Sequence, residues 1–85
     1  MAKNTVQYFR GELIPNYVDN KTRLIKYVLK KYRDRDPISN AEFVFDLRCT
    51  RFGGVLHDLR DAGWQIETIR HKDKSHFMYY LVSTP

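Results

Sequence analysis

The chain has 85 residues, 42% of them hydrophobic and 14% aromatic, and a formal net charge of +5. This length predicts one domain with a small core, and the composition excludes an intrinsically disordered chain. No apolar run is as long as a membrane span, and the start, MAKNTVQYFR, lacks a signal-peptide core, so we expect a cytoplasmic protein without membrane contact. The single cysteine, Cys49, excludes an internal disulfide and is typical of a reducing compartment.

The positive charge favours a polyanionic partner, but it is unevenly distributed along the chain. Residues 1–36 hold nine Lys or Arg and four Asp or Glu, whereas residues 37–85 hold six of each. The second part carries the motifs described below and is neutral, which counts against an argument from a simple basic patch.

Residues 1–18 are expected to form an N-terminal arm ahead of a main domain at residues 19–85. Gly11 and Pro15 oppose one long helix, and the apolar residues between Val6 and Ile14 suit a short strand or an irregular arm. Two roles are open: the arm covers an apolar surface of the core, or it joins two copies in a homodimer. We favour the first, because terminal segments are often simply tethered to their domain.

Residues 19–33 are expected to form a helix with Asp19 or Asn20 as its cap. One face is apolar, and its residues are Leu24, Ile25, Val28, Leu29 and Tyr32. Most of the remaining positions are basic, namely Lys21, Arg23, Lys26, Lys30, Lys31 and Arg33. A solvated helix face explains most of these charges, and a few are left to reach phosphates. The helix should end before Pro37, and Pro37-Ile38 should be extended.

Residues 38–63 indicate two short helices joined by a tight turn. Ser39 and Glu42 have the spacing of a capping box at the start of the first helix, whose apolar side we assign to Ala41, Val44, Phe45 and Leu47. Thr50 is the expected cap of the second helix. Phe52, Val55, Leu56 and Leu59 then recur at helical spacing, and Gly63 provides the stop. This pattern is typical of a helix-turn-helix, in which the second helix enters the DNA major groove.

After Gly63 the apolar period changes to two. The runs at 64–71 and 76–82 are rich in β-formers, place Ile66 and Ile69 on opposite faces, and enclose a polar turn at 71–75, so we expect a β-hairpin. A helix, a helix pair and a C-terminal hairpin follow one another in a winged helix-turn-helix. The expected fold is therefore α+β, with three helices, a hairpin wing and an N-terminal arm.

DNA-contacting residues are expected at the start of the second helix and in the wing. Arg51 is the main candidate in the helix, because a guanidinium can pair with guanine in a bidentate manner, although an ion pair with a nearby Asp would also explain it. Thr50, Gly54 and His57 share the outer face with Asp58 and Asp61, and we expect these two carboxylates to pair with Arg60, Arg48 or the first helix. Arg70, His71, Lys72 and Lys74, with His76 beside them, make the wing locally basic and suit phosphate or minor-groove contact.

Gly53 and Gly54 are unusual in a first helical turn, where each costs roughly 0.5–1 kcal/mol relative to Ala. Two explanations for this glycine pair are equally favoured. Either the helix N-terminus approaches a phosphate or base closely, or a tight helix–helix contact needs small residues.

Catalysis and metal binding have little support in the sequence. His57 and Asp58 are adjacent and would point in different directions from a helix, and Cys49 has no base placed for it. Cys49, His71 and His76 lack a familiar metal-ligand spacing. We therefore expect no enzyme activity, no metal and no cofactor.

The segment ISNAEFVFDLRCTRFGGVLHDLRDAGWQIET resembles the small winged helix-turn-helix proteins of bacteriophages and prophages. The matching residues are Ile38, Ser39 and Glu42; Thr50, Arg51 and Phe52; His57, Asp58, Leu59 and Arg60; and Gly63, Trp64 and Ile66. The resemblance covers residues 20–82 in layout and 38–66 in detail. It departs at Val55, where many relatives carry Arg, and at Gly53-Gly54, which replace a small polar or Ala pair; both changes weaken base reading.

The resemblance implies a double-stranded DNA-binding regulator of phage transcription or recombination, acting in a bacterial cell or phage-infected host. The alternative is a protein-interaction module on the same scaffold. In that case the neutral second helix and an aromatic hairpin surface (Phe77, Tyr79 and Tyr80) would dock on a phage or host protein.

Overall fold

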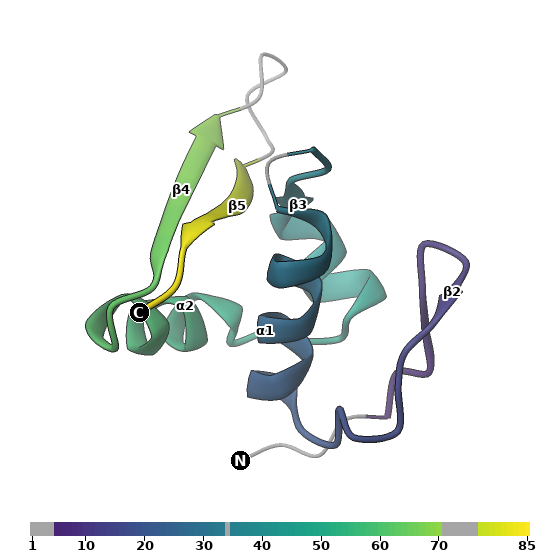
Figure 1. The fold of residues 1–85 in the computed structure, drawn as a ribbon. Helices are drawn as coiled ribbons and strands as arrows, with labels where there is room; N and C mark the ends of the chain where they lie inside the picture. The colour runs from purple at the N-terminus through teal and green to yellow at the C-terminus, as the bar shows by residue number, and fades with distance from the viewer. Residues whose placement is uncertain (1–4, 34, 71–76) are drawn as a thin grey trace.

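The computed structural model describes residues 5–33, 35–70 and 77–85 (Figure 1). They form a small α+β fold of three helices and two antiparallel sheets. The elements in chain order are β1 (Tyr8–Phe9), β2 (Glu12–Leu13), α1 (Lys21–Tyr32), β3 (Ile38–Ser39), η1 (Glu42–Asp46), α2 (Phe52–Asp61), β4 (Gln65–Arg70) and β5 (Phe77–Ser83). In Figure 1 the β4–β5 hairpin lies to the left of α1 and the β1–β2 hairpin to its right.

Helix α1 has the cap and the buried face that its sequence predicts. The Asn20 side chain accepts a hydrogen bond from the Arg23 backbone N–H at 2.9 Å. The predicted apolar face is buried along its length, through Leu24, Ile25, Val28 and Leu29. Lys21 was expected on the solvated face, but it is 9% exposed, because its ammonium turns inward to the end of η1.

The three-stranded sheet has the order β3-β5-β4. The hairpin prediction is confirmed by the pairing of Ile66 with Leu81, and both of these side chains are buried. Ile69 lies on the opposite face and is 43% exposed, as the period of two predicts. Ile38 is extended, as expected, and pairs with Tyr79, a contact that local sequence signals did not predict.

Helix η1 begins with the predicted capping box but buries a different face. The Glu42 N–H donates to Ser39 Oγ at 3.1 Å, and the Ser39 N–H donates to Glu42 Oε1 at 3.1 Å. The helix is a widened π-turn, in which the Leu47 N–H donates to the Glu42 carbonyl at 2.8 Å. Phe43 and Leu47, four residues apart, are buried, whereas Phe45 is 77% exposed. The assignment of Phe45 to the apolar side was therefore wrong.

Helix α2 starts later than predicted and stops where predicted. Its N-cap is Arg51, without a side-chain capping bond, so the assignment of that role to Thr50 was wrong. The turn between η1 and α2 is one residue longer than predicted. In it the Cys49 N–H donates a hydrogen bond to the Phe43 carbonyl at 2.7 Å. At the other end Gly63 has φ +100° and the Trp64 N–H donates to the Leu59 carbonyl at 3.0 Å, which is a Schellman stop.

The core joins the three helices, the three-stranded sheet and the N-terminal arm. Three aromatic rings fasten η1, α2 and β5 together: the Phe43 ring stacks on Phe52 at 4.9 Å, and Tyr79 contacts both at 5.8 and 5.7 Å. Tyr79 packs against the core, so its assignment to an exposed docking surface was wrong. The N-terminal arm also contributes buried residues, namely Phe9, Ile14 and Val18.

One arginine ties the β1–β2 hairpin to the helix pair. The Arg10 guanidinium makes a bidentate pair with the Glu42 carboxylate, with both N···O distances at 2.8 Å. It also donates to the carbonyls of Asp36 and Pro37 at 3.2 and 3.1 Å and lies 4.6 Å from the centre of the Tyr32 ring. Arg10 holds this position at φ 53°, in the left-handed region, so its interactions offset a local backbone cost.

Replacing Arg10 with Ala should lower the free energy of unfolding by about 2–3 kcal/mol, because a half-buried carboxylate loses its charged donor. Arg10→Lys should recover only part of this loss, because an ammonium cannot form the bidentate pair. Ala, Lys and Arg meet the same backbone cost at φ 53°, so the comparison isolates the side chain. Urea unfolding followed by far-UV circular dichroism measures the effect; equal stability of all three proteins would contradict it.

The same pair should make stability depend on pH. Burial alone would raise the pKa of Glu42, but the hydrogen bonds from Arg10 and Ser39 outweigh it and hold the pKa below its ordinary value. Because the folded-state pKa is the lower one, this stabilisation is complete above the unfolded pKa of about 4.3 and is lost as the pH falls through the folded value. Glu42→Gln should therefore destabilise the protein more at pH 7 than at about pH 3. An equal loss at both pH values would contradict this assignment.

Candidate nucleic-acid interface

The N-terminal end of α2 opens onto a hollow of about 430 Å³. Its lining includes Arg48, Thr50 and Arg51 from the turn, together with Val55 from α2, Cys49, and Lys21 and Thr22 from α1. The structure thus brings two of the predicted helix residues, Thr50 and Arg51, to one mouth, and both are exposed. Gly53 and Gly54 lie in the first turn of α2, and His57 lies farther along the helix.

Gly53 and Gly54 face open space. A Cβ atom built on either glycine would meet no heavy atom within 4 Å, leaving aside the backbone of the helix itself. The explanation by a tight helix–helix contact is therefore wrong. The Gly54 N–H donates to the Arg51 carbonyl at 3.1 Å, so the N–H groups of Phe52 and Gly53 precede the bonds within the helix, as at other helix starts.

Arg51 has no ion pair with any carboxylate in the described parts of the chain. The alternative explanation, an arginine engaged with a nearby Asp, therefore finds no support among those residues. Its guanidinium stands at the mouth of the hollow, exposed to solvent. Among the described residues no carboxylate neutralises this cation, so its charge is available to a ligand.

Arg48 is a further basic residue that lines this hollow. The sequence had suggested it only as a partner for Asp58 or Asp61. It is exposed and lines the same hollow as Arg51. Its φ of 53° is left-handed, which costs a non-glycine residue roughly 1–2 kcal/mol. The only sequence signal for its position was its place in the short connection between two helices, three residues before the Arg51 cap.

Lys21 lines the same hollow and contacts the residue before Arg48. Its ammonium donates to the Leu47 carbonyl at 2.9 Å, at the end of η1, where a positive charge is favourable. Burial lowers the pKa of Lys21 below its ordinary value. This lysine holds the corner that carries Arg48 and is not itself presented to solvent.

Asp61 of α2 is paired differently from the prediction. Asp61 lies 3.4 Å from His57, one turn away, and both side chains are exposed. Arg60, the expected partner, instead donates to the Ile66 carbonyl at 2.9 Å and to Thr68 Oγ1 at 3.2 Å. The expected pairing was therefore wrong for Asp61, because the turn at Gly63 brings β4 within reach of Arg60. His57 stays on the outer face, as predicted.

Of the predicted wing residues, the structure describes Arg70. It ends β4 opposite Phe77, with its guanidinium 5.9 Å from the centre of that ring. His71, Lys72, Lys74 and His76 lie outside the described residues. Figure 1 shows β4 leaving the C-terminal end of α2 and running away from it, so Arg70 lies at the end of the strand remote from that helix.

The described residues offer no set of three or more His, Cys, Asp or Glu side chains able to hold a metal ion. Cys49 is buried, and this burial raises the pKa of its thiol, so the thiolate form is disfavoured. Within the same ranges no helix combines the length and the apolar character needed to cross a membrane.

Comparisons of the chain with protein-family models, with curated proteins and with solved structures found no match.

The two ends of α2 should respond in opposite ways to alanine. Gly54→Ala should raise the free energy of unfolding by about 0.5–1 kcal/mol, because the site is open and Ala favours a helix. Gly63→Ala should lower it by about 1–2 kcal/mol, because φ is +100° and the new Cβ would lie 3.2 Å from Pro85 Cγ. Thermal unfolding of the two variants beside the wild type measures both; a loss at Gly54 would show that its surroundings are closed.

Proposed function

We propose that this chain is a winged helix-turn-helix protein that binds double-stranded DNA, with α2 as the recognition helix and the β4–β5 hairpin as the wing. The described order of α1, η1, α2 and the hairpin supports this, since it is the order typical of that fold. The addition of β3 to the hairpin sheet fits the same proposal, because it anchors the wing beside the helix pair.

The observation that carries the proposal is the exposed N-terminal end of α2. Two arginines, Arg48 and Arg51, line one hollow there, and the first turn of α2 has two glycines in open space. Glycines lower the stability of a helix start, and no contact with the described residues explains them. Close approach of a large external surface, such as the wall of a DNA groove, would explain both the two exposed arginines and the two glycines.

Each residue of this end then has a chemical role. Arg51 would read a guanine through its O6 and N7 atoms, and Arg48 would hold a phosphate beside it. Thr50 would donate its hydroxyl, and the backbone at Gly53 and Gly54 would come close to the DNA. His57 would contact the groove farther along the helix.

The wing would complete the interface. Arg70 would hold the backbone from the end of β4, and we assign the same role to His71, Lys72 and Lys74, which lie outside the described residues. The resemblance to phage and prophage proteins adds the biological setting: a regulator of phage transcription or recombination, acting in the cytoplasm of a bacterium. A homodimer would suit a palindromic operator.

A preferred duplex should first be selected from a random DNA pool by the purified protein. Arg51→Ala should then weaken binding to it by about 1–3 kcal/mol and relax preference at one base pair. Arg48→Ala and Arg70→Ala should each lower the slope of log affinity against log salt by about 0.9. Gly54→Ala should weaken binding while the fold becomes more stable.

Fluorescence anisotropy at several salt concentrations measures these effects. Lys30→Ala is the control, because it removes one positive charge from the outer face of α1. If Arg51→Ala and Lys30→Ala weaken binding equally, or if the affinity does not vary with salt, the proposal fails.

An interaction module that binds a phage or host protein remains the second candidate. Its support is now the outer surface of the hairpin, where Ile69 and Val82 are exposed, together with Phe45 on η1. Under that proposal Arg51→Ala would leave partner binding intact, whereas a charged residue in place of Val82 would abolish it.

A further inference from the structure

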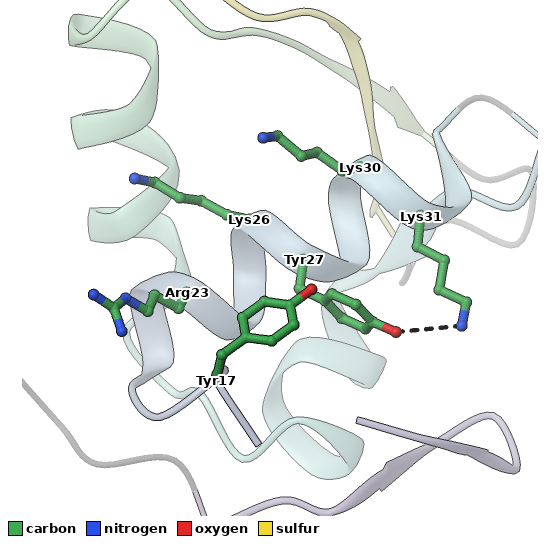
Figure 2. Close-up of a pocket in the computed structure, with 6 residues that line it drawn as sticks. All are labelled: Tyr17, Arg23, Lys26, Tyr27, Lys30 and Lys31. Atoms are coloured by element: carbon green, nitrogen blue, oxygen red, sulfur yellow. Dashed lines mark hydrogen bonds between the residues drawn. The ribbon is translucent and has the colours of Figure 1, made fainter. Parts of the chain in front are cut away.

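A second hollow, of about 560 Å³, lies on the outer face of α1. Its lining consists of four basic and two aromatic side chains: Tyr17, Arg23, Lys26, Tyr27, Lys30 and Lys31. It shares no lining residue with the hollow at the start of α2. Figure 2 shows the two tyrosine rings side by side, with Arg23 toward one end of the helix and Lys31 toward the other.

The hollow keeps a net positive charge. Arg23 pairs with Asp19 at 2.9 Å and Lys31 pairs with Glu12 at 3.0 Å, so these two cations are balanced. Lys26 and Lys30 have no carboxylate partner in the described ranges. Their ammonium groups lie 5.7 and 5.5 Å from the centre of the Trp64 ring, which places two positive charges at one rim.

The aromatic wall is open to solvent. Tyr17 is 67% exposed, and its ring meets Tyr27 edge to face, with centroids 6.5 Å apart and planes at 79°. Tyr27 is held in turn by Lys31, whose ammonium donates to its hydroxyl oxygen at 3.3 Å (Figure 2). The outer ring is therefore available for stacking, while the inner one is fixed.

These features select among anionic partners. A peptide of acidic residues alone would use the lysines but would leave the exposed Tyr17 ring without a stacking partner. A duplex stacks its bases inside the helix and presents only its edges and phosphates. An unpaired strand offers both a phosphate and an exposed base face, and a hollow of this volume suits one or two nucleotide units.

We propose that the outer face of α1 binds single-stranded nucleic acid, with Lys26 and Lys30 holding successive phosphates and Tyr17 stacking on a base. A groove of cations beside a stacking ring is the usual means of binding such strands without sequence preference. This inference does not depend on duplex binding at α2, since different residues form the two surfaces.

The test uses labelled oligothymidylate and oligouridylate of about 12 nucleotides, within the span that one small domain covers, and measures fluorescence anisotropy with the full chain. Lys26→Gln/Lys30→Gln should weaken binding at least tenfold relative to Arg48→Gln/Arg51→Gln, which removes the same net charge from another surface. Tyr17→Leu should weaken it about fivefold or more, whereas Tyr17→Phe should keep it. DNA and RNA should bind similarly if stacking and phosphates dominate.

Three results would overturn the inference. The two double variants could weaken binding equally, which would reduce the effect to net charge. Tyr17→Leu could leave affinity unchanged, or a polyglutamate peptide could compete as well as the oligonucleotide, which would indicate a protein partner. Duplex binding measured on the same proteins separates the proposals: Lys26→Gln/Lys30→Gln should spare it, and a failure at α2 would leave the single-strand result standing.

Discussion

The carboxylate of Glu42 is the point on which the arrangement of the described chain depends. It accepts hydrogen bonds from the backbone and hydroxyl of Ser39, shortly before η1, and from the guanidinium of Arg10, in the turn between β1 and β2. Arg10 in turn binds the carbonyls of Asp36 and Pro37, directly before β3. One partly buried charge pair therefore fixes the N-terminal hairpin, the entry to the sheet and the first helix of the pair together.

The hydrogen bonds of Glu42 with Arg10 and Ser39 determine where α2 can lie. With η1 fixed at its start, Phe43 is directed into the core, where its ring stacks on Phe52 at the first residue of α2. Lys21 closes the other end of η1 through the Leu47 carbonyl. The turn from Arg48 to Arg51 is thus held at both sides, and this rigidity is what a surface that reads a ligand by geometry requires.

The sequence predicted features whose cause lies within a few residues. The Asn20 cap, the Ser39–Glu42 box and the Gly63 stop are confirmed because each needs only local donors and acceptors. Phe45 was assigned to the core in place of Phe43, since a short apolar run on a π-turn gives no clear period. The burial of Lys21 and the binding of Arg60 to β4 depend on segments that only the fold brings together, so no local pattern could predict them.

The two positively charged surfaces differ in how tightly their geometry is fixed, and this difference bears on what each can recognise. At α2 the cations lie on a constrained turn, Arg48 at a left-handed φ and Arg51 at the cap, beside a bare helix start. The backbone of this turn is thus constrained, and a planar guanidinium fork loses less freedom per hydrogen bond than an ammonium does, which would suit discrimination between bases. On α1 the free charges are lysines on long stems resting over Trp64, and an ammonium with many rotamers binds phosphate as a point charge. The neutral total charge of residues 37–85 is therefore compatible with a reading surface, because fixed direction, not excess charge, distinguishes one base from another.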